Sequence, residues 1–331
     1  MATSIQQQTL AVSKPSSMNP SNKGKAIPSV ARANHILAGA KSTRKARRQH
    51  ASAFLSWCSK QGEGLPRLQD ASKELVIKYL HYRQHGNPAA GVKAVSIGTL
   101  RNIQSSLNAM INLNRAASDA RRLTSFETGL PMRSRIGKKR PITDAEFAAA
   151  IEKALVIGEP GFVLMLQLER YLGLRGQEAL MIWRALQRFQ IAKAARGQAP
   201  ERLEVLEGTK GGRYRAIEFI EAKRDQTLEF LDQAFTYASQ NDQVLLKGKK
   251  ATLLSARTRY TNLCQKIGLV GEIAPHSLRY AYATEKLTEL HASGMTRKQA
   301  SQWVAMNLGH GTSRDRFVRS VYGRSVGDGL K

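Results

Sequence analysis

Residues 129–141, "GLPMRSRIGKKRP", form the break that most constrains how this chain can fold. Glycine, proline and basic residues follow one another there without an apolar period, and such stretches interrupt helices and strands. Periodic segments lie on both sides, and 331 residues are enough for two domains with cores of their own. We therefore expect a helical domain over residues 44–128, a linker over 129–141 and a second domain over 142–331.

Residues 1–43 have a different character from the rest of the chain. They contain no acidic residue and are rich in Ser, Asn, Gln and Lys, which predicts a disordered basic tail. A transit peptide is the alternative, although Arg32 is the only arginine before Arg44. The segment lacks the basic start and apolar core of a secretory signal, so we do not expect export.

The charge of the chain indicates its partner. Lys and Arg number 52 against 25 Asp and Glu, a formal charge of +27, which favours a polyanion and above all nucleic acid. A membrane surface is the weaker alternative, because no run of about 18 apolar residues occurs. Cys58 and Cys264 are the only cysteines and no CxxC spacing exists, which argues against a disulfide framework or zinc finger and favours a reducing cytosol.

Helical periodicity dominates both predicted domains. In the first, helices are expected over residues 42–60, 71–83 and 96–115, with Ser42 or Thr43 as the N-cap of the first. In the second, residues 161–186 predict two helices joined near Gly173, and Thr143 with Glu146 has the spacing of a capping box.

One segment alternates instead of following a helical period. Leu203 and Val205 precede a Gly-Gly turn, and Ile217 and Phe219 follow it, which predicts a β-hairpin. The predicted fold class is therefore mainly α with a small β-sheet (α+β).

"GLRGQE" contains the first candidate for chemistry, Arg175, with Glu178 three positions later. Either the carboxylate steadies the guanidinium at a helix start, or the two form an ordinary surface ion pair. The apolar runs around Arg175 favour burial, and a buried arginine needs a partner.

Two further stretches carry cations. Lys210 lies beside the predicted hairpin turn, where it could simply favour solubility or could reach DNA and donate a proton to a departing oxygen. In "PHSLRYAYATEKL", Pro275 offers a helix start, so His276 and Arg279 would share one face at a helix N-terminus. That position suits a phosphate, although an exposed basic helix start is the alternative.

"LGHGTSRDRFVRSVYG" completes the set. His310 is expected on a sharp turn, and Thr312 or Ser313 is expected to cap a final helix. Tyr322 lies beside the apolar stripe of that helix, where most aromatic residues only pack against the core.

The order Arg175, Lys210, His276, Arg279, His310, Tyr322 resembles the signature of the tyrosine recombinases, the phage-type integrases. Its boxes read "GLRGQE", "TKGGR", "HSLR", "LGH" and "VY" in this chain, and the resemblance covers about residues 141–323. The helical module before them is similar to the family's core-binding domain in architecture and charge alone. His310 and Tyr322 are 12 positions apart, further than is common in the family, and Tyr280 stands where the family often has histidine.

This resemblance implies two domains that form a clamp around DNA. It implies a site-specific recombinase or integrase that cleaves and rejoins strands through a 3′-phosphotyrosyl intermediate, without metal, ATP or another cofactor. Tyr322 would be the nucleophile, and Lys210 would protonate the leaving 5′ oxygen. The two arginines, Arg175 and Arg279, would bind the phosphate oxygens, and the two histidines would assist proton transfer.

The implied setting is a bacterial cytoplasm and its nucleoid, where the protein would serve a mobile genetic element. Its partners would be double-stranded DNA, three further copies in a homotetramer on two DNA sites, and accessory DNA-bending proteins. Two alternatives remain: a type IB topoisomerase-like nicking-closing enzyme, and a non-catalytic DNA-binding protein of the same fold. The long spacing between His310 and Tyr322 is the motive for the second.

Overall fold

The computed structural model describes residues 41–65, 67–113, 123–131 and 139–323. The chain divides into two compact units, Met1–Arg133 and Ser134–Lys331, and the division falls inside the stretch at 129–141. Almost all of the predicted tail, and residues 132–138 of the predicted linker, lie outside the described residues. The predicted clamp concerns the placement of the two units relative to each other, and it stays a prediction.

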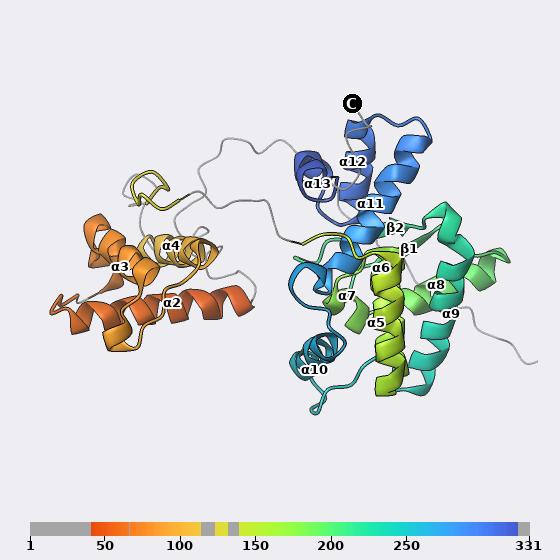
Figure 1. Ribbon diagram of the computed structural model, residues 1–331, viewed down its shortest axis with the longest axis horizontal. Coiled ribbons are helices and arrows are strands. Elements are labelled where there is room, and N and C mark those ends of the chain that lie inside the picture. The colour runs from red at the N-terminus through yellow and green to blue at the C-terminus, as the bar shows by residue number, and fades with distance from the viewer. Residues whose placement is uncertain (1–40, 66, 114–122, 132–138, 324–331) are drawn as a thin grey trace, which may run out of the picture. The chain divides into compact units, whose positions relative to one another are not determined.

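The first unit is helical, as the sequence predicts, with helices α2 (Lys41–Lys60), α3 (Lys73–His85) and α4 (Ile97–Ile111) (Figure 1). The side chains of Ser72 and Ser96 cap α3 and α4 by accepting backbone N–H groups. Phe54 and Trp57 of α2 pack against Tyr79 of α3, with ring centroids 5.2 and 5.3 Å from its ring. An aromatic cluster therefore holds this small core together.

The start of α2 differs from the prediction. The helix already includes residues 41–43, so Ser42 and Thr43 lie inside it and neither is its N-cap. Residues 41–60 contain no glycine or proline that would prevent the helix from beginning earlier. The end of the predicted tail is thus part of a helix.

The second unit surrounds one central helix (Figure 1). This helix, α6 (Pro160–Leu172), packs against α5, α7, α9 and α11, and Leu164, Leu166 and Leu168 are all buried in it. A helix that is apolar on nearly every face must lie inside the domain. The other helices are α5 (Asp144–Ile157), α7 (Gly176–Leu180), α8 (Trp183–Arg196), α9 (Arg224–Gln240), α10 (Leu253–Lys266), α11 (His276–Ala292), α12 (Arg297–Asn307) and α13 (Asp315–Val321).

The stretch after α5 contains three helices where the sequence predicts two. The predicted break at Gly173 is present, with φ at +59°, in the left-handed region that favours glycine. The second predicted helix is divided again, because the Met181 N–H bonds to the carbonyls of both Gln177 and Glu178 and ends α7 after five residues. This short helix brings Arg175 and Glu178 to the site described below.

The predicted hairpin is confirmed. Strands β1 (Arg202–Val205) and β2 (Arg215–Glu218) are antiparallel, and Leu203 pairs with Ile217 in the core. Residues 206–214 join the strands as a loop, here called the hairpin loop, with the predicted Gly-Gly turn at Gly211 and Gly212 near its tip. The fold class is confirmed as mainly helical with one small sheet in the described residues.

The two ends of the second unit are capped differently. Thr143 and Glu146 form the predicted capping box at the start of α5. The predicted caps of the last helix are wrong: Thr312 and Ser313 belong to a separate 3₁₀ turn, Thr312–Arg314, and no side chain caps α13. This turn forms because the Arg314 N–H bonds to the carbonyl of Gly311.

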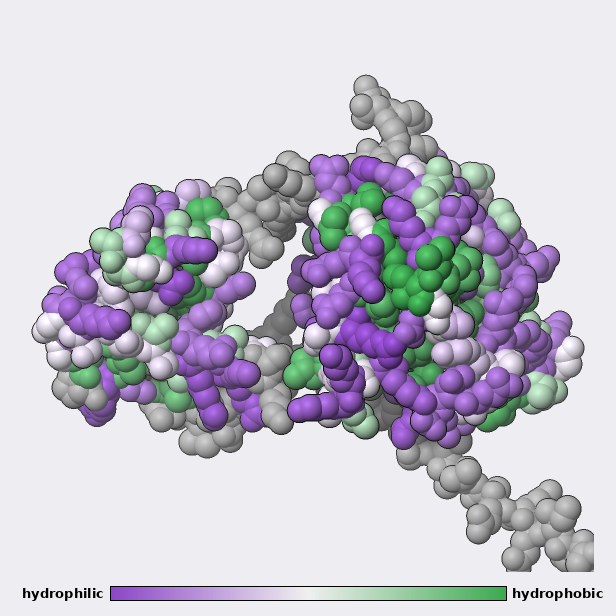
Figure 2. All heavy atoms as spheres, turned by 60° about the horizontal axis from the view of Figure 1, so that its bottom comes forward, coloured by the Kyte–Doolittle hydropathy of each residue, from purple (hydrophilic) through white to green (hydrophobic). Residues whose placement is uncertain are grey.

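Hydrophilic side chains cover most of the face that Figure 2 shows on each unit. Within the described residues, no helix has the length and apolar character needed to cross a bilayer.

Candidate active site

Arg175 and Glu178 form the pair that their spacing predicts. Arg175 precedes α7; its Nη1 donates to Glu178 Oε1 at 2.6 Å and its backbone N–H to Oε2 at 2.8 Å. The Glu178 side chain is fully buried, whereas that of Arg175 is 23% exposed. The pair is therefore no surface ion pair: a buried carboxylate orients a guanidinium that keeps one side open.

Arg279, in the first turn of α11, is a buried arginine that shares a hydrogen-bond acceptor with Arg175. Its Nη1 donates to the Gly173 carbonyl and its Nη2 to the Leu308 carbonyl, both at 2.5 Å. Arg175 Nη2 also donates to Leu308 O, at 3.3 Å, so the two arginines meet there, two residues before His310. Burial, together with the charges of Arg215 and Arg175, lowers the pKa of Arg279 to about 9, so it stays charged at neutral pH.

Arg215 is the third arginine of the site, and the sequence reasoning missed it. It lies on β2 opposite Val205, and its side chain has no exposed surface. Its Nη1 forms an ion pair with Glu178 Oε2, and its Nε donates to the Asn307 carbonyl at 2.8 Å. The sequence did indicate its direction, because Arg215 lies two residues before the inward-facing Ile217, and alternate residues of a strand face the same side.

These three arginines and Glu178, here called the arginine cluster, carry an excess of positive charge. Although burial alone would raise it, Arg215, Arg279 and Arg175 hold the pKa of Glu178 below its ordinary value, so this one carboxylate is ionised. The cluster therefore has a net charge of about +2, and buried charge without a counterion is costly. An anion bound at its open side would remove that cost.

A second carboxyl group nearby does not supply this anion. Glu169 of α6 is fully buried and accepts a hydrogen bond from the Tyr260 hydroxyl at 2.9 Å. Burial raises the pKa of Glu169 to about 8, so it is mostly protonated at neutral pH.

His310 and Tyr322 lie beside the cluster. His310 is on the predicted sharp turn, between Gly309 and Gly311, whose φ angles are +66° and +79°. The Tyr322 hydroxyl is 3.5 Å from His310 Nε2, to which it can donate, and its ring packs edge-on against Tyr280 with centroids 4.5 Å apart. Tyr322 is thus buried in the core, as the packing interpretation requires, while its hydroxyl points to the site.

The long spacing between His310 and Tyr322 has a local explanation. The added residues form the 3₁₀ turn Thr312–Arg314 and then α13. Val318 of α13 is fully buried, and its carbonyl accepts the Tyr322 N–H at 2.8 Å. The chain therefore leaves the turn, makes one short helix and returns the tyrosine ring to His310.

His276 is the first residue of α11, and its ring packs edge-on against Tyr280 with centroids 5.4 Å apart. Burial lowers its pKa to about 3, helped by the charges of Arg279 and Lys139. Burial lowers the pKa of His310 to about 3 as well, again with Arg279 beside it. Both imidazoles are neutral at neutral pH and can accept protons.

Lys210 is set apart from the other five predicted residues. It is exposed in the hairpin loop, and within the described part of the chain no hydrogen bond or ion pair joins it to them. Gly208 fits tightly against α7, because a Cβ there would lie 2.7 Å from Gln177 O, whereas Gly211 has open space around it. The base of the loop is therefore anchored and its tip is free to approach a ligand.

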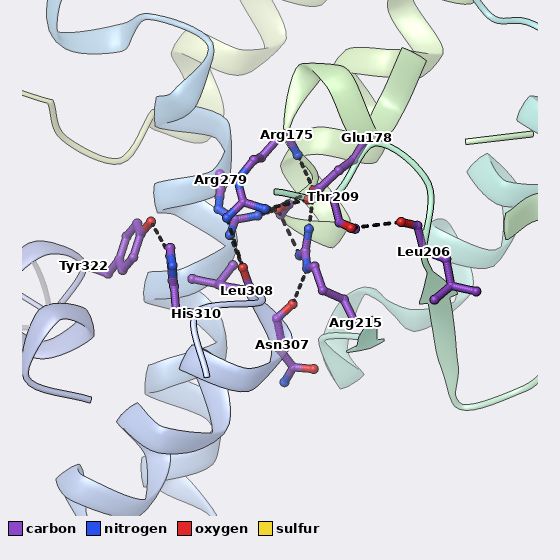
Figure 3. A network of polar contacts seen from close by, with 11 residues as sticks. Arg175, Glu178, Leu206, Thr209, Arg215, Arg279, Asn307, Leu308, His310 and Tyr322 are labelled. Carbon is purple, nitrogen blue, oxygen red and sulfur yellow. Dashed lines mark hydrogen bonds and ion pairs between the residues drawn. The ribbon is translucent and has the colours of Figure 1, made fainter. Parts of the chain in front are cut away.

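Figure 3 shows how the site is assembled. Arg175 and Arg279 converge from α7 and α11, and the His310 side chain lies between them and Tyr322. Among the described residues, no group of three or more His, Cys, Asp or Glu side chains is arranged to hold a metal ion. The arrangement as a whole offers fixed positive charge beside a hydroxyl and a neutral imidazole.

A family model described as "Integrase" matches residues 129–285, which include Arg175, Lys210, His276 and Arg279. The comparison with curated proteins gave no significant match.

Several solved structures are similar to this chain. The XerH site-specific recombinase bound to its difH substrate before cleavage is 15% identical, with a TM-score of 0.50 over 92% of this chain and 90% of that one. A lambda integrase tetramer bound to a Holliday junction is 16% identical, with a TM-score of 0.49 over 92% and 79%. The Tn1549 transposon integrase in complex with transposon end DNA is 14% identical, with a TM-score of 0.48 over 87% and 92%.

Proposed function

We propose that this chain is a tyrosine recombinase (phage-type integrase) that cleaves and rejoins DNA at specific sites through a 3′-phosphotyrosyl intermediate. The observation that carries this proposal is the arginine cluster with its net charge of about +2, placed beside the Tyr322 hydroxyl and a neutral His310. A phosphodiester supplies the missing anion, and its transition state carries still more negative charge.

The cluster binds the scissile phosphate. Arg175, with its open side, contacts the non-bridging oxygens, and the buried Arg279 stabilises their charge from below. Because carbonyls and Glu178 already fix both guanidinium groups, little reorganisation is needed when charge develops.

Tyr322 attacks the phosphorus atom in line. A bond forms between the Tyr322 oxygen and phosphorus while the bond from phosphorus to the 5′ oxygen breaks. His310 accepts the tyrosine proton through Nε2, with His276 assisting, and Lys210 donates a proton to the leaving 5′ oxygen. The new bond conserves the phosphodiester energy, so a 5′-hydroxyl can reverse the step without ATP or a metal.

The assembly proposed for this chemistry extends beyond one chain. Duplex DNA is the partner, and a formal charge of +27 supports strong binding to its backbone. The resemblance to the integrase family supports a homotetramer on two DNA sites, with the two units clamping the duplex and accessory proteins bending it. We place the protein in the bacterial cytoplasm, at the nucleoid, in the service of a mobile element.

The alternatives differ in their products. A topoisomerase-like enzyme would relax supercoils but would form no recombinants between two sites, so recombinant products decide between the two. The non-catalytic alternative rested on the spacing from His310 to Tyr322, and the 3.5 Å approach of their side chains argues against it.

Covalent capture tests the proposal and requires no defined DNA site. The wild-type protein is incubated with a pool of nicked duplexes of randomised sequence, in which the cleaved fragment diffuses away and traps the adduct. We expect complexes that survive SDS and are destroyed by protease, and sequencing of their DNA identifies a site.

Tyr322→Phe should abolish this adduct and retain non-covalent binding. Tyr280→Phe is the matched control, because it removes the hydroxyl of the neighbouring buried ring, and it should still form the adduct. Adduct formation by Tyr322→Phe would disprove the nucleophile, and a wild-type protein that never forms an adduct would disprove the proposed function.

A further inference from the structure

Arg215 joins three segments that are distant in the sequence. From β2, its Nε donates to Asn307 O at 2.8 Å, its Nη1 pairs with Glu178 Oε2, and its Nη2 donates to Gly173 O at 3.4 Å. One side chain thus connects the hairpin, α7 and the turns that end α6 and α12.

Arg279 makes a parallel connection from α11. It also donates to Gly173 O, and its second acceptor, Leu308 O, is the carbonyl next to Asn307 O. The two arginines therefore hold the same two turns together from opposite elements. They compete for one carboxylate oxygen, because Glu178 Oε2 pairs with Arg215 and lies 3.8 Å from Arg279 Nη1.

The burial of Arg215 separates its role from that of Arg175. Its side chain has no exposed surface, whereas Arg175 is 23% exposed. Its donors already point to protein acceptors, so it has no free face for a phosphate. A buried arginine with this contact set acts on the site through other residues.

We propose that Arg215 is a positioning residue that keeps the Glu178 carboxylate on Arg175 and away from Arg279. This inference rests on the proposed function, since it assigns a role within that site. While Arg215 occupies Oε2, the carboxylate stays in place to orient Arg175, and Arg279 keeps its charge for the phosphate.

Loss of Arg215 has a defined consequence for Glu178. Its Oε2 would lose its ion pair with Arg215 and keep only the Arg175 backbone N–H, while Arg279 Nη1 lies 3.8 Å away. A movement of about 1 Å would close that gap to a hydrogen bond. Misplacement of this size in a catalytic site can lower a rate about 100-fold.

The experiment uses Arg215→Met and Arg215→Lys on a duplex selected by the wild-type protein. Each is assayed for adduct formation on the ordinary duplex and on one with a sulfur atom in place of the 5′ bridging oxygen. A thiol has a pKa near 8.5, so this leaving group needs no proton, and the substitution bypasses Lys210.

Arg215→Met should form the adduct about 100-fold more slowly on both duplexes, with unchanged non-covalent DNA binding. Arg215→Lys should recover part of the rate, because an ammonium group can still pair with Glu178. A wild-type rate for Arg215→Met would overturn the inference. So would full rescue by the sulfur duplex, because Arg215 would then act only by placing the hairpin loop.

A crystal structure of Arg215→Met without DNA tests the inference independently of activity. The distance from Glu178 Oε2 to Arg279 Nη1 should fall from 3.8 Å to hydrogen-bond length, and an unchanged distance would overturn the inference. If Arg215→Met does not fold, Arg215→Gln replaces it, because it also lacks the charge that pairs with Glu178, and its Glu178 carboxylate should likewise lie closer to Arg279. If the wild-type protein forms no adduct, the proposed function fails, and this structural result still decides whether Arg215 positions Glu178.

Discussion

The arginine cluster and the hairpin loop supply positive charge to one site in opposite ways. Arg175, Arg215 and Arg279 are fixed by Glu178 and by carbonyl groups, whereas Lys210 is exposed and has glycines with open space beside it. Groups that stabilise charge work best when they are already in place, and a group that transfers a proton must come within reach of it. Damage to the cluster should therefore affect both stability and activity, and damage to the loop should affect stability much less.

The largest expected effect is that of Lys210→Ala. General acid catalysis contributes about 10²- to 10⁴-fold, so adduct formation on an ordinary duplex should slow by about this factor. The midpoint of thermal unfolding should not change, because Lys210 is exposed and contacts none of the other site residues in the described chain.

Two controls sharpen this prediction. The duplex with a bridging sulfur should restore the rate of Lys210→Ala, since its leaving group needs no proton. Arg213→Ala removes an exposed charge from the same loop and should slow the reaction little. An equal defect in both variants, unrelieved by sulfur, would make Lys210 a backbone contact instead of an acid.

Glu178→Gln should have the largest effect on stability. It leaves three arginines, two of them buried, without their carboxylate, and breaking a buried ion pair costs about 3–5 kcal/mol. Glu207→Gln is the matched control in the hairpin loop, where Glu207 pairs with the partly exposed Arg188. It should cost about 1 kcal/mol or less in chemical denaturation, and equal losses would contradict the contrast between cluster and loop.

The sequence predicted the local structure around the site residues better than it predicted the long-range contacts that fix those residues in place. Arg175, Arg279, His310 and Tyr322 lie in short local patterns, and their expected turns and helix starts are present. Local patterns cannot identify a partner 37 positions away, which is the separation of Arg215 from Glu178.

Local patterns also failed to predict the burial of Arg215 and the break between α7 and α8. The inward parity of Arg215 was visible, but alternation predicts burial for apolar residues, and a charge is buried only where an opposite charge meets it. The break between α7 and α8 at Met181 involves no glycine or proline, so no local residue announces it. The roles of the predicted site residues stay predictions until the variants above are measured.

Gly309→Ala and Gly211→Ala compare the two regions at the level of the backbone. Both glycines have positive φ, +66° and +75°, so each alanine costs about 1 kcal/mol of conformational strain. A Cβ at Gly309 would also lie 2.8 Å from Arg215 Cδ, whereas one at Gly211 meets nothing within 4 Å. Gly309→Ala should therefore lose about 2–3 kcal/mol of unfolding free energy against about 1 for Gly211→Ala, and equal losses would show that the turn does not depend on Arg215.

The smallest expected effect is a pH dependence of stability that comes from His310, beside the arginine cluster. Burial lowers the pKa of His310 to about 3, while the unfolded chain has a value near 6.5. Between these values the unfolded state binds the extra proton, so the contribution of His310 to stability is complete above pH 6.5 and is lost as the pH falls toward 3. At pH 5.5 the loss is about 1 kcal/mol.

Comparison with a variant isolates this contribution. Glu169, whose pKa burial raises to about 8, changes stability in the opposite direction over the same range, so the wild-type curve alone is not diagnostic. The difference in unfolding free energy between wild type and His310→Gln cancels the Glu169 contribution, and it should shrink by about 1 kcal/mol between pH 7.5 and pH 5.5. Lys210→Ala should differ from wild type by the same amount at both pH values, because the hairpin loop is not part of the buried charge that holds His310 neutral. A constant difference for His310→Gln would mean that its imidazole is not held neutral beside the cluster, and it would remove the proton acceptor from the proposed mechanism.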